Sequence, residues 1–378
     1  MKLLIPNQIG GDEKRVALVP AVIKKLVADK HEVLVESGAG LLASHDDDAY
    51  IASGARIVAP QTAWNEADIV LVVRPPTVES VQQMRRGALL AGMIKPLDHP
   101  EFLQAIAPTG VTAMALELLP RITRAQAMDV LSSQANLAGY ESVILAAETL
   151  EKIFPMMMTA AGTLQPARVF VIGAGVAGLQ AIATAKRLGA VVSAYDVRPA
   201  VKEQVQSVGA KFIELPLDTA GAQDAGGYAK EQSAEQQQKQ RDLMAKVIAD
   251  SDVVITTALV PGKPAPKLIP ASAVERMQRG SVIVDLASER GGNCELTEPG
   301  QIVVKHGVTI IGLTNVAALV PAHASQVYAA NLHKLLAILI NKEGQLNLDL
   351  NDEIVAGVVV CHDGNVVHPL IKKILGIE

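Results

Sequence analysis

The sequence predicts an α/β protein with two Rossmann-like domains, one of them a doubly wound dinucleotide-binding domain, joined by long interdomain helices. The first observation is a strand–turn–helix–strand unit over residues 167–196, with three glycines in the spacing G-x-G-x-x-G and an acid at its end. The second is a series of short β-branched segments that alternate with helical segments along most of the 378 residues. The third is a composition of 49% apolar but only 3% aromatic residues, which suits parallel strands buried under alanine-rich helices.

The glycine unit predicts a binding site for a dinucleotide. Gly173 permits the tight turn, Gly175 lets the backbone approach a pyrophosphate, and Gly178 lets helix and strand pack closely. The N-terminus of the helix that follows presents N–H groups to the phosphates. Asp196 ends the second strand, where its carboxylate can accept hydrogen bonds from the adenosine ribose. It favours NAD(H), because it would repel a 2′-phosphate.

Arg198 leaves two interpretations open. It is either a surface charge or, as in some sites, an arginine that accommodates the 2′-phosphate of NADP.

Composition excludes several classes of protein. A net charge of −5 gives no attraction to nucleic acid or to anionic lipid. Cys294 and Cys361 are too few for a disulfide framework or a cysteine-based zinc site, so we expect a reducing compartment and no metal. The N-terminus turns polar too early for a signal peptide. Although the mean hydropathy is +0.27, no apolar run approaches the roughly 18 residues of a spanning helix. We therefore expect a soluble, cytoplasmic chain that can dock on a membrane partner.

The alternation of segments predicts the domain boundaries. Strand signals near residues 2–6, 31–37, 55–59, 68–74, 88–93 and 111–117 give a first α/β domain, which lacks the glycine motif. Further signals at 210–215, 252–259, 281–287 and 308–315 continue the nucleotide domain. A helix at 322–339 and a hairpin-like tail are expected to return to the first domain. The prediction is one domain from 1–134 plus 320–378, and an NAD(H)-binding domain from 135–319.

Two further segments each allow more than one interpretation. A helical pattern over 125–154 leads to three consecutive methionines, which suit adaptable packing better than a ligand set. The polar stretch 216–241 reads as a solvated helix preceded by the string AGGY. That string is either a disordered surface loop or a lid in which Tyr228 closes over bound nucleotide.

The segment RITRAQAMDVLSSQANLAGY, residues 121–140, carries an unusual run of polar groups. Thr123 and Gln126 have the form of a helix capping box. On a helix, Gln126, Asp129 and Ser133 would form one polar stripe, with Ser132 beside it. The stripe is either a cleft face near the domain junction or a solvent-exposed helix face.

These segments resemble a known family. The strings RITRAQAMDVLSSQANLAGY, FPMMMTAAGT, GAGVAGLQAIATAKRLGA, AGGYAKE, TTALVPGKPAP, DLASERGGNC and GLTNV are similar to the NAD(H)-binding component, domain I, of proton-translocating nicotinamide nucleotide transhydrogenase. The chain resembles the bacterial arrangement in which domain I is a separate polypeptide. The resemblance implies a homodimer on the cytoplasmic face of the inner membrane. It also implies direct hydride transfer between NAD(H) here and NADP(H) on domain III of the beta subunit, coupled to proton passage through membrane-spanning alpha and beta segments.

The resemblance also implies site residues. Arg121, Gln126 and Asp129, with Ser132, match a loop that positions the nicotinamide, a catalytic role without acid or base chemistry. The loop with Gly227 and Tyr228 matches one that closes on the nucleotide. The other residues implied in cofactor binding are Gly173, Gly175, Val176, Gly178, Asp196, Val197, Arg198, Thr257, Ala258 and Leu259.

Two other functions remain as alternatives. Alanine dehydrogenase shares the two-domain pattern, but it needs a lysine and a histidine in the first domain. Here Arg74 stands where the lysine would be and Lys95 where the histidine would be, while His99 is displaced. A non-catalytic NAD-sensing module would keep Asp196 and the glycines without needing the stripe.

Overall fold

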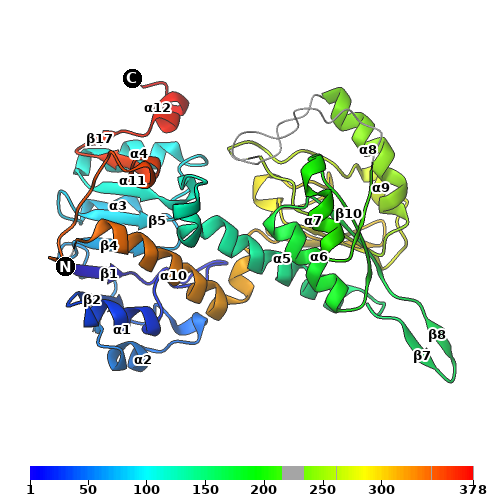
Figure 1. The fold of residues 1–378 in the computed structure, drawn as a ribbon, viewed down its shortest axis with the longest axis horizontal. Helices are drawn as coiled ribbons and strands as arrows, with labels where there is room; N and C mark the ends of the chain where they lie inside the picture. Colours follow the sequence, from blue (N-terminus) through cyan, green and yellow to red (C-terminus); the bar gives the residue numbers. More distant parts are fainter. Residues whose placement is uncertain (215–233, 261, 342, 378) are drawn as a thin grey trace. The chain divides into compact units, whose positions relative to one another are not determined.

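The computed structural model describes residues 1–214, 234–260, 262–341 and 343–377. It divides the chain into two compact units (Figure 1). Unit 1 contains Met1–Gln134 and Ala318–Glu378, and unit 2 contains Ala135–Ala317. The α/β class with two Rossmann-like domains, predicted from the sequence, is confirmed by the topology of both sheets.

Unit 1 is built on an eight-stranded sheet in the order β17-β16-β6-β5-β4-β1-β2-β3. Its first six strands are parallel and follow the Rossmann order, so the direction of strand addition reverses between β1 and β4. The strands are β1 (Lys2–Ile5), β2 (Glu32–Glu36), β3 (Arg56–Val58), β4 (Ile69–Val72), β5 (Leu89–Gly92), β6 (Thr112–Ala115), β16 (Val359–His362) and β17 (Asn365–Val366).

Helices bury both faces of this sheet. Alternate residues of β1 point to opposite faces of the sheet, and both faces are buried, since Leu3 and Ile5 belong to one apolar cluster and Leu4 to another. Tyr328, Leu332 and other residues of α10 pack in the first cluster. The helices are α1 (Pro20–Ala28), α2 (Asp47–Ala52), α3 (Val78–Gln82), α4 (Pro100–Ile106), α10 (Pro321–Leu339), α11 (Glu353–Val358) and α12 (Pro369–Leu375).

Unit 2 repeats the architecture with a seven-stranded sheet in the order β11-β10-β9-β12-β13-β15-β14. Only β14, an edge strand that the sequence patterns did not predict, is antiparallel to its neighbour. The strands are β9 (Arg168–Ile172), β10 (Val191–Tyr195), β11 (Lys211–Phe212), β12 (Val253–Thr256), β13 (Val282–Asp285), β14 (Ile302–Lys305) and β15 (Val308–Ile311). The helices are α6 (Val176–Arg187), α7 (Lys202–Ser207), α8 (Ala234–Ala249) and α9 (Ala271–Val274).

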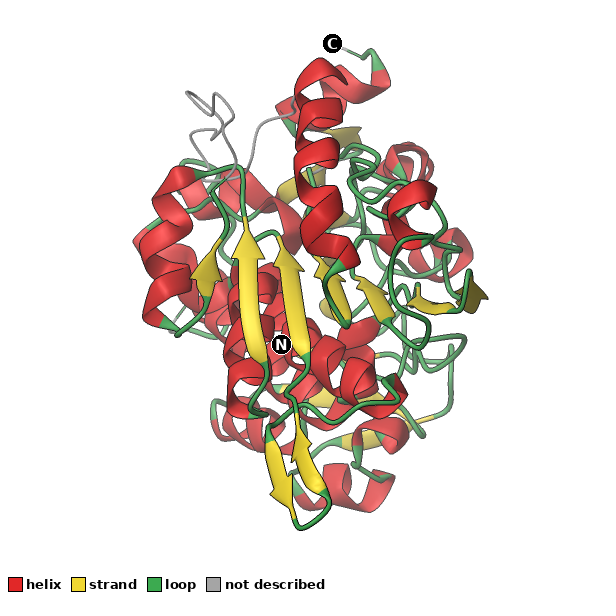
Figure 2. Cartoon of the chain, turned by 90° about the vertical axis from the view of Figure 1, so that its right-hand side faces the viewer, coloured by secondary structure: helices red, strands yellow, loops and turns green. Residues whose placement is uncertain are grey.

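Two predictions of local structure were wrong, and a third was right except at its start. The helix expected from residue 125 begins at Val130 as α5 (Val130–Thr149) and is preceded by a 3-10 segment, Thr123–Met128. The methionine segment is not packed inside the chain, because β7 (Met157–Thr159) and β8 (Gly162–Leu164) form an exposed antiparallel hairpin (Figures 1 and 2). The expected C-terminal hairpin is present, because β16 and β17 pair antiparallel, and it returns to the first domain, where β16 pairs with β6. Only its first residues differ from the prediction, since they belong to helix α11.

Among the described residues, no helix is both long and apolar enough to span a membrane.

Candidate functional site

The glycine turn of unit 2 connects β9 to α6 and is closely packed. Gly173 has φ +95°, and a Cβ there would lie 2.4 Å from Oγ1 of Thr257. A Cβ on Gly178 would lie 1.8 Å from the carbonyl oxygen of Gly173. Both positions therefore require glycine, one for its backbone angle and both for the approach of neighbouring atoms. Thr257, which follows β12, donates a hydrogen bond to Gly173 O over 3.1 Å and so joins the ends of β9 and β12.

Gly175 differs from the other two glycines because the described residues leave the space beside it open. Among them, the nearest atom to a Cβ built there is Nη2 of Arg198, at 4.0 Å. Gly175 is the N-cap of α6, and no side chain among the described residues caps this helix. Unbonded N–H groups at a helix N-terminus favour an anion, and the site lies where strand order reverses between β9 and β12. The cradle therefore fits the pyrophosphate of a dinucleotide.

Asp196 and Arg198 form a buried ion pair next to this turn. The side chain of Asp196 is 4% exposed and that of Arg198 is 15% exposed. Nη2 of Arg198 lies 2.8 Å from Oδ2 of Asp196, and its Nε lies 2.9 Å from Oδ1. The interpretation of Arg198 as a surface charge is therefore wrong, since the neighbouring carboxylate draws the guanidinium inward.

The segment after β12 is fixed by a side chain that the sequence patterns missed. Asn293, fully buried, accepts a hydrogen bond from Ala258 N (3.1 Å) and donates one to Ala258 O (2.8 Å). Asp285, also fully buried, accepts hydrogen bonds from Thr297 Oγ1 (2.6 Å) and Cys294 N (3.0 Å) and so shapes the loop that carries Asn293. The only signal for Asn293 in the sequence was the polar string that follows the buried strand β13.

Leu259, the last predicted residue of this segment, is 40% exposed.

The remaining predicted residues of unit 2 lie around the turn or outside the described ranges. Val176 is exposed at the first position of α6, and Val197 is half-buried after β10. Gly227 and Tyr228, predicted to close on the nucleotide, lie outside the described residues.

The predicted residues of unit 1 surround the break between the 3-10 segment and α5. Asp129 has an extended conformation, and its Oδ1 accepts a hydrogen bond from Ser132 N over 2.9 Å, as an N-cap does. Its Oδ2 accepts a second from Ser132 Oγ over 2.6 Å. Arg121 and Gln126 are exposed. Asp129 thus ends one segment and begins the next.

The expected stripe on a single helix face is therefore wrong, and so is the capping box. Gln126 belongs to the 3-10 segment, and no side-chain cap is formed at Ile122, the residue before Thr123. Ser133 turns inward, where its Oγ donates to Oδ1 of Asn331 in α10 over 2.7 Å. Nδ2 of Asn331 also donates to Ala127 O over 2.9 Å. These bonds hold the 3-10 segment and the start of α5 against α10.

The structure thus brings the predicted residues together in two groups. Residues 121–132 belong to unit 1, and the glycine turn with Asp196, Arg198, Thr257 and Ala258 belongs to unit 2.

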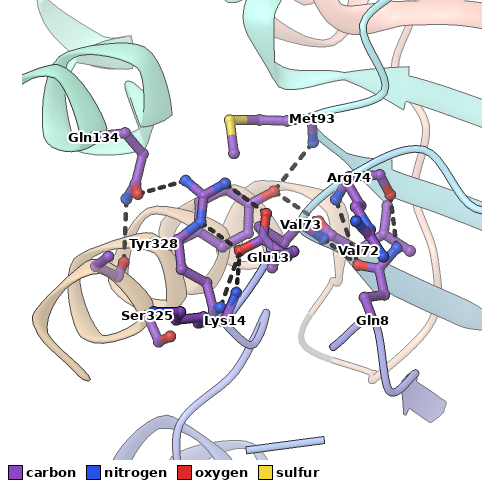
Figure 3. A network of polar contacts seen from close by, with 12 residues as sticks. Gln8, Glu13, Lys14, Val72, Val73, Arg74, Met93, Gln134, Ser325 and Tyr328 are labelled. Atoms are coloured by element: carbon purple, nitrogen blue, oxygen red, sulfur yellow. Dashed lines mark hydrogen bonds and ion pairs between the residues drawn. The ribbon is translucent and has the colours of Figure 1, made fainter. Parts of the chain in front are cut away.

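A buried polar network in unit 1, which the sequence patterns also missed, includes Glu13 and Gln134 (Figure 3) and joins them through Arg15. Arg15 and Glu13 are 7% and 2% exposed, and Nη2 and Nε of Arg15 donate to the two Glu13 oxygens over 2.7 and 2.8 Å. Nη1 of Arg15 donates to Oε1 of Gln134, and Nε2 of Gln134 donates to Ala324 O. The network therefore ties the loop after β1 to the first turns of α5 and α10.

The same loop is hydrogen-bonded to the segment that follows β4, at the edge where open α/β sheets bind ligands. Gln8 donates to Arg74 O over 2.7 Å and accepts from Val73 N over 2.6 Å. Nη1 of Arg74 donates to Gly10 O over 3.1 Å. Tyr328 donates to Val72 O over 2.7 Å and closes the same edge (Figure 3). The chain's own groups thus satisfy one another at this edge.

Glu117, at the end of β6, carries an unusual carboxyl group. Its Oε1 accepts a hydrogen bond from Lys95 N over 2.7 Å, whereas its Oε2 is buried with no hydrogen-bond partner among the described residues. Burial raises the pKa of Glu117 to about 7, against the lowering effect of the Lys95 N–H group.

The raised pKa of Glu117 predicts a pH-dependent stability of unit 1. Because the carboxyl binds its proton more tightly when folded, the stabilisation is complete below the ordinary pKa of 4.5 and is lost as the pH rises through about 7. Trp64, the single tryptophan, is buried in unit 1 and reports its unfolding. Urea unfolding followed by Trp64 fluorescence should show stability falling from pH 5 to 8, and Glu117→Gln should flatten that slope. An unchanged slope in the variant would contradict the assignment.

Comparisons with known proteins identify the family. A model described as the alanine dehydrogenase/PNT N-terminal domain matches residues 4–138, and one for the C-terminal domain matches residues 142–369. The chain belongs to the alanine dehydrogenase/PNT family. It is 52% identical over 377 residues to a chain of Rhodospirillum rubrum that is named as an NAD(P) transhydrogenase subunit alpha, covering 98% of both chains.

Solved structures agree with this family. A transhydrogenase structure from Sinorhizobium meliloti is 45% identical, has a TM-score of 0.85, and is matched over 98% of this chain and 100% of that one. An L-alanine dehydrogenase structure is 26% identical, with a TM-score of 0.83 over 100% of this chain and 99% of that one. The resemblance to the transhydrogenase component, predicted from the sequence, is confirmed at family level. The chain is thus an alanine dehydrogenase/PNT family member of the transhydrogenase alpha type, an oxidoreductase component.

Proposed function

We propose that this chain is the NAD(H)-binding component of a proton-translocating transhydrogenase. Unit 2 binds NAD(H), and hydride passes directly to or from NADP(H) on domain III of a beta subunit. Membrane-spanning alpha and beta segments couple this transfer to proton movement, and the chain works from the cytoplasmic face of the inner membrane through those subunits. The observation that carries the proposal is the 52% identity, over nearly the whole of both chains, to a relative named as a transhydrogenase alpha subunit.

The proposed chemistry asks the protein to bind and position. Bound NADH supplies a hydride from C4 of its nicotinamide. The start of α6 binds the pyrophosphate beside Gly175, and Asp196 binds the adenosine ribose. Thr257, Ala258 and Leu259 extend the site along the end of β12. No acid or base on this chain is needed, because no proton is transferred in the step.

The family resemblance also gives residues of unit 1 a role in the proposed reaction. Arg121, Gln126 and Asp129, with Ser132, orient the nicotinamide end, and the loop with Gly227 and Tyr228 closes over the nucleotide. Holding two nicotinamide carbons about 3 to 3.5 Å apart is the main contribution that a protein can make to direct hydride transfer.

The pairing of cations in unit 1 favours this function over alanine dehydrogenase. An amino-acid dehydrogenase must bind a substrate carboxylate with a cation, but Glu13 already occupies two nitrogens of Arg15. The guanidinium of Arg74 is bonded to Gly10 O. His99, the remaining candidate base, is exposed and contacts Glu101.

Gly175→Ala tests the proposed cradle. The backbone of Gly175 has φ −76°, which alanine adopts without strain, and within the described part of the chain its Cβ would meet only Arg198, at 4.0 Å. The variant should therefore fold with an unchanged Tm but bind NADH on the order of tenfold more weakly, because the methyl group holds the pyrophosphate away from the turn. Equilibrium dialysis measures the affinity. Wild-type affinity in the variant would show that the pyrophosphate binds elsewhere.

We also propose that two copies associate through the hairpin. Met156, Met157, Met158 and Leu164 are 59%, 46%, 76% and 49% exposed, an unusual concentration of apolar side chains on a short hairpin. The sequence instead suggests the hairpin-like segment 355–367 as the dimer contact, but its Val355, Val360 and Val366 are buried within unit 1.

Replacing Met157 and Met158 by glutamine should weaken the dimer by about tenfold or more, as expected for losing central apolar contacts of an interface. Sedimentation velocity over a dilution series measures this change. The matched control replaces Ile302 and Val304, two exposed apolar side chains of the edge strand β14, and should leave the dimer intact. Equal effects of the two double variants would rule out the hairpin as the contact.

A further inference from the structure

We propose that Arg198 is a latent binding group for a 2′-phosphate, silenced by Asp196, so that the pair acts as one filter between NAD(H) and NADP(H). This inference rests on the proposed binding of a nicotinamide dinucleotide by unit 2. In such sites either an acid selects NAD(H) or a nearby arginine accommodates NADP(H). Here the geometry points to the acid and the arginine together.

The first step of the argument is the saturation of the carboxylate. Oδ1 of Asp196 accepts hydrogen bonds from the backbone N and the Nε of Arg198, over 2.8 and 2.9 Å. Oδ2 accepts from Nη2 of Arg198 and from Ala174 N, over 2.8 and 2.7 Å. A carboxylate offers about four acceptor sites, so all are in use. A ribose hydroxyl that donates to Asp196 must therefore displace a guanidinium N–H.

The second step is the position of the guanidinium. Nη2 of Arg198 is the atom nearest to a Cβ built on Gly175, so the charge lies beside the open face of the glycine turn. The backbone hydrogen bond from Ala174 to Asp196 joins the carboxylate to the same turn. The adenosine half of a dinucleotide must pass this point if its pyrophosphate binds at the start of α6.

The third step is charge. Asp196 and Arg198 are both largely buried, where charges interact strongly because water screens them little. With the carboxylate present, the pair has no net charge and a 2′-phosphate meets an anion at close range. Without the carboxylate, a buried guanidinium is left beside the ribose, and such a group binds phosphate through two parallel hydrogen bonds. Removing Asp196 should therefore uncover a phosphate site rather than merely destroy a ribose site.

The test compares Asp196→Asn, Arg198→Gln and the double variant with the wild type, by fluorescence titration with NADH and NADPH. Asp196→Asn should bind NADPH on the order of tenfold to a hundredfold more tightly than the wild type does, as expected for new hydrogen bonds to a charged group. Adenosine 2′-monophosphate should compete better than adenosine 5′-monophosphate in this variant. The double variant should show neither the tighter binding of NADPH nor the better competition by adenosine 2′-monophosphate. Asp196→Ser, which keeps an acceptor for Ala174 N, repeats the test if the asparagine variant does not fold.

Three results separate the claims. If Asp196→Asn and the double variant gain NADPH affinity equally, loss of repulsion explains the change and Arg198 has no role. If neither Asp196→Asn nor Asp196→Ser gains it, the latent site does not exist. If the wild type fails to bind NADH at all, the proposed function itself fails, irrespective of the variants.

Discussion

Gln126→Asn is expected to slow hydride transfer by about 100-fold or more while leaving the affinity for NADH within a few fold. Gln126 lies on the exposed 3-10 segment, whose position is fixed by Asn331 and by the Asp129 cap. The substitution keeps the amide but withdraws it by one methylene, and a misplacement of about 1 Å costs this much in a reaction that depends on alignment.

Single-turnover kinetics with an NADP(H)-loaded partner, together with equilibrium dialysis of NADH, measure the two quantities separately. Gln82→Asn makes the same change on α3, at another exposed position of unit 1. This control variant should leave the rate of hydride transfer and the affinity for NADH unchanged. Equal rates of hydride transfer for the two variants would show that Gln126 does not belong to the proposed site.

Glu13→Gln is expected to destabilise unit 1 by roughly 3 to 5 kcal/mol, the cost of removing one partner from a buried ion pair. The guanidinium of Arg15 would stay buried with two of its donors facing a neutral amide. The double replacement Glu13→Leu with Arg15→Met should recover much of the loss, since two apolar groups of similar volume leave no unpaired charge.

Denaturant unfolding followed by the fluorescence of Trp64 reports the stability of unit 1. A loss below about 1 kcal/mol for Glu13→Gln would mean that Arg15 finds water or another acceptor, and that the network contributes little to this loop.

The regions of the fold that depend on local pattern could be predicted from the sequence. β9, the glycine turn and α6 are contiguous, and the roles of Gly173 and Gly178 follow from spacing alone. The buried parallel strands were recognisable because burial on both faces leaves continuous apolar runs. β14 was missed although three of its four residues are apolar, because it is short and lies only two residues before β15.

Features set by contacts between distant residues could not be predicted. Helical periodicity passes through Asp129 without a break, although its side chain caps α5 and interrupts the helix there. Arg15 pairs with Gln134, 119 residues away. Asn293 reaches the segment after β12 only because Asp285 folds the intervening loop. Even for Arg198, two residues from Asp196, a surface charge stayed a possible interpretation, because its burial depends on packing.

The central claim is direct hydride transfer between a nucleotide on this chain and one on a separate partner. The most direct test mixes the purified chain with NADH deuterated at C4 and a domain III partner loaded with NADP⁺. The account predicts deuterium in NADPH, none from solvent, no transfer when either protein is omitted, and no reduction of NAD⁺ by alanine. Alanine-dependent reduction of NAD⁺ by the chain alone, or failure of transfer with every cognate partner, would contradict it.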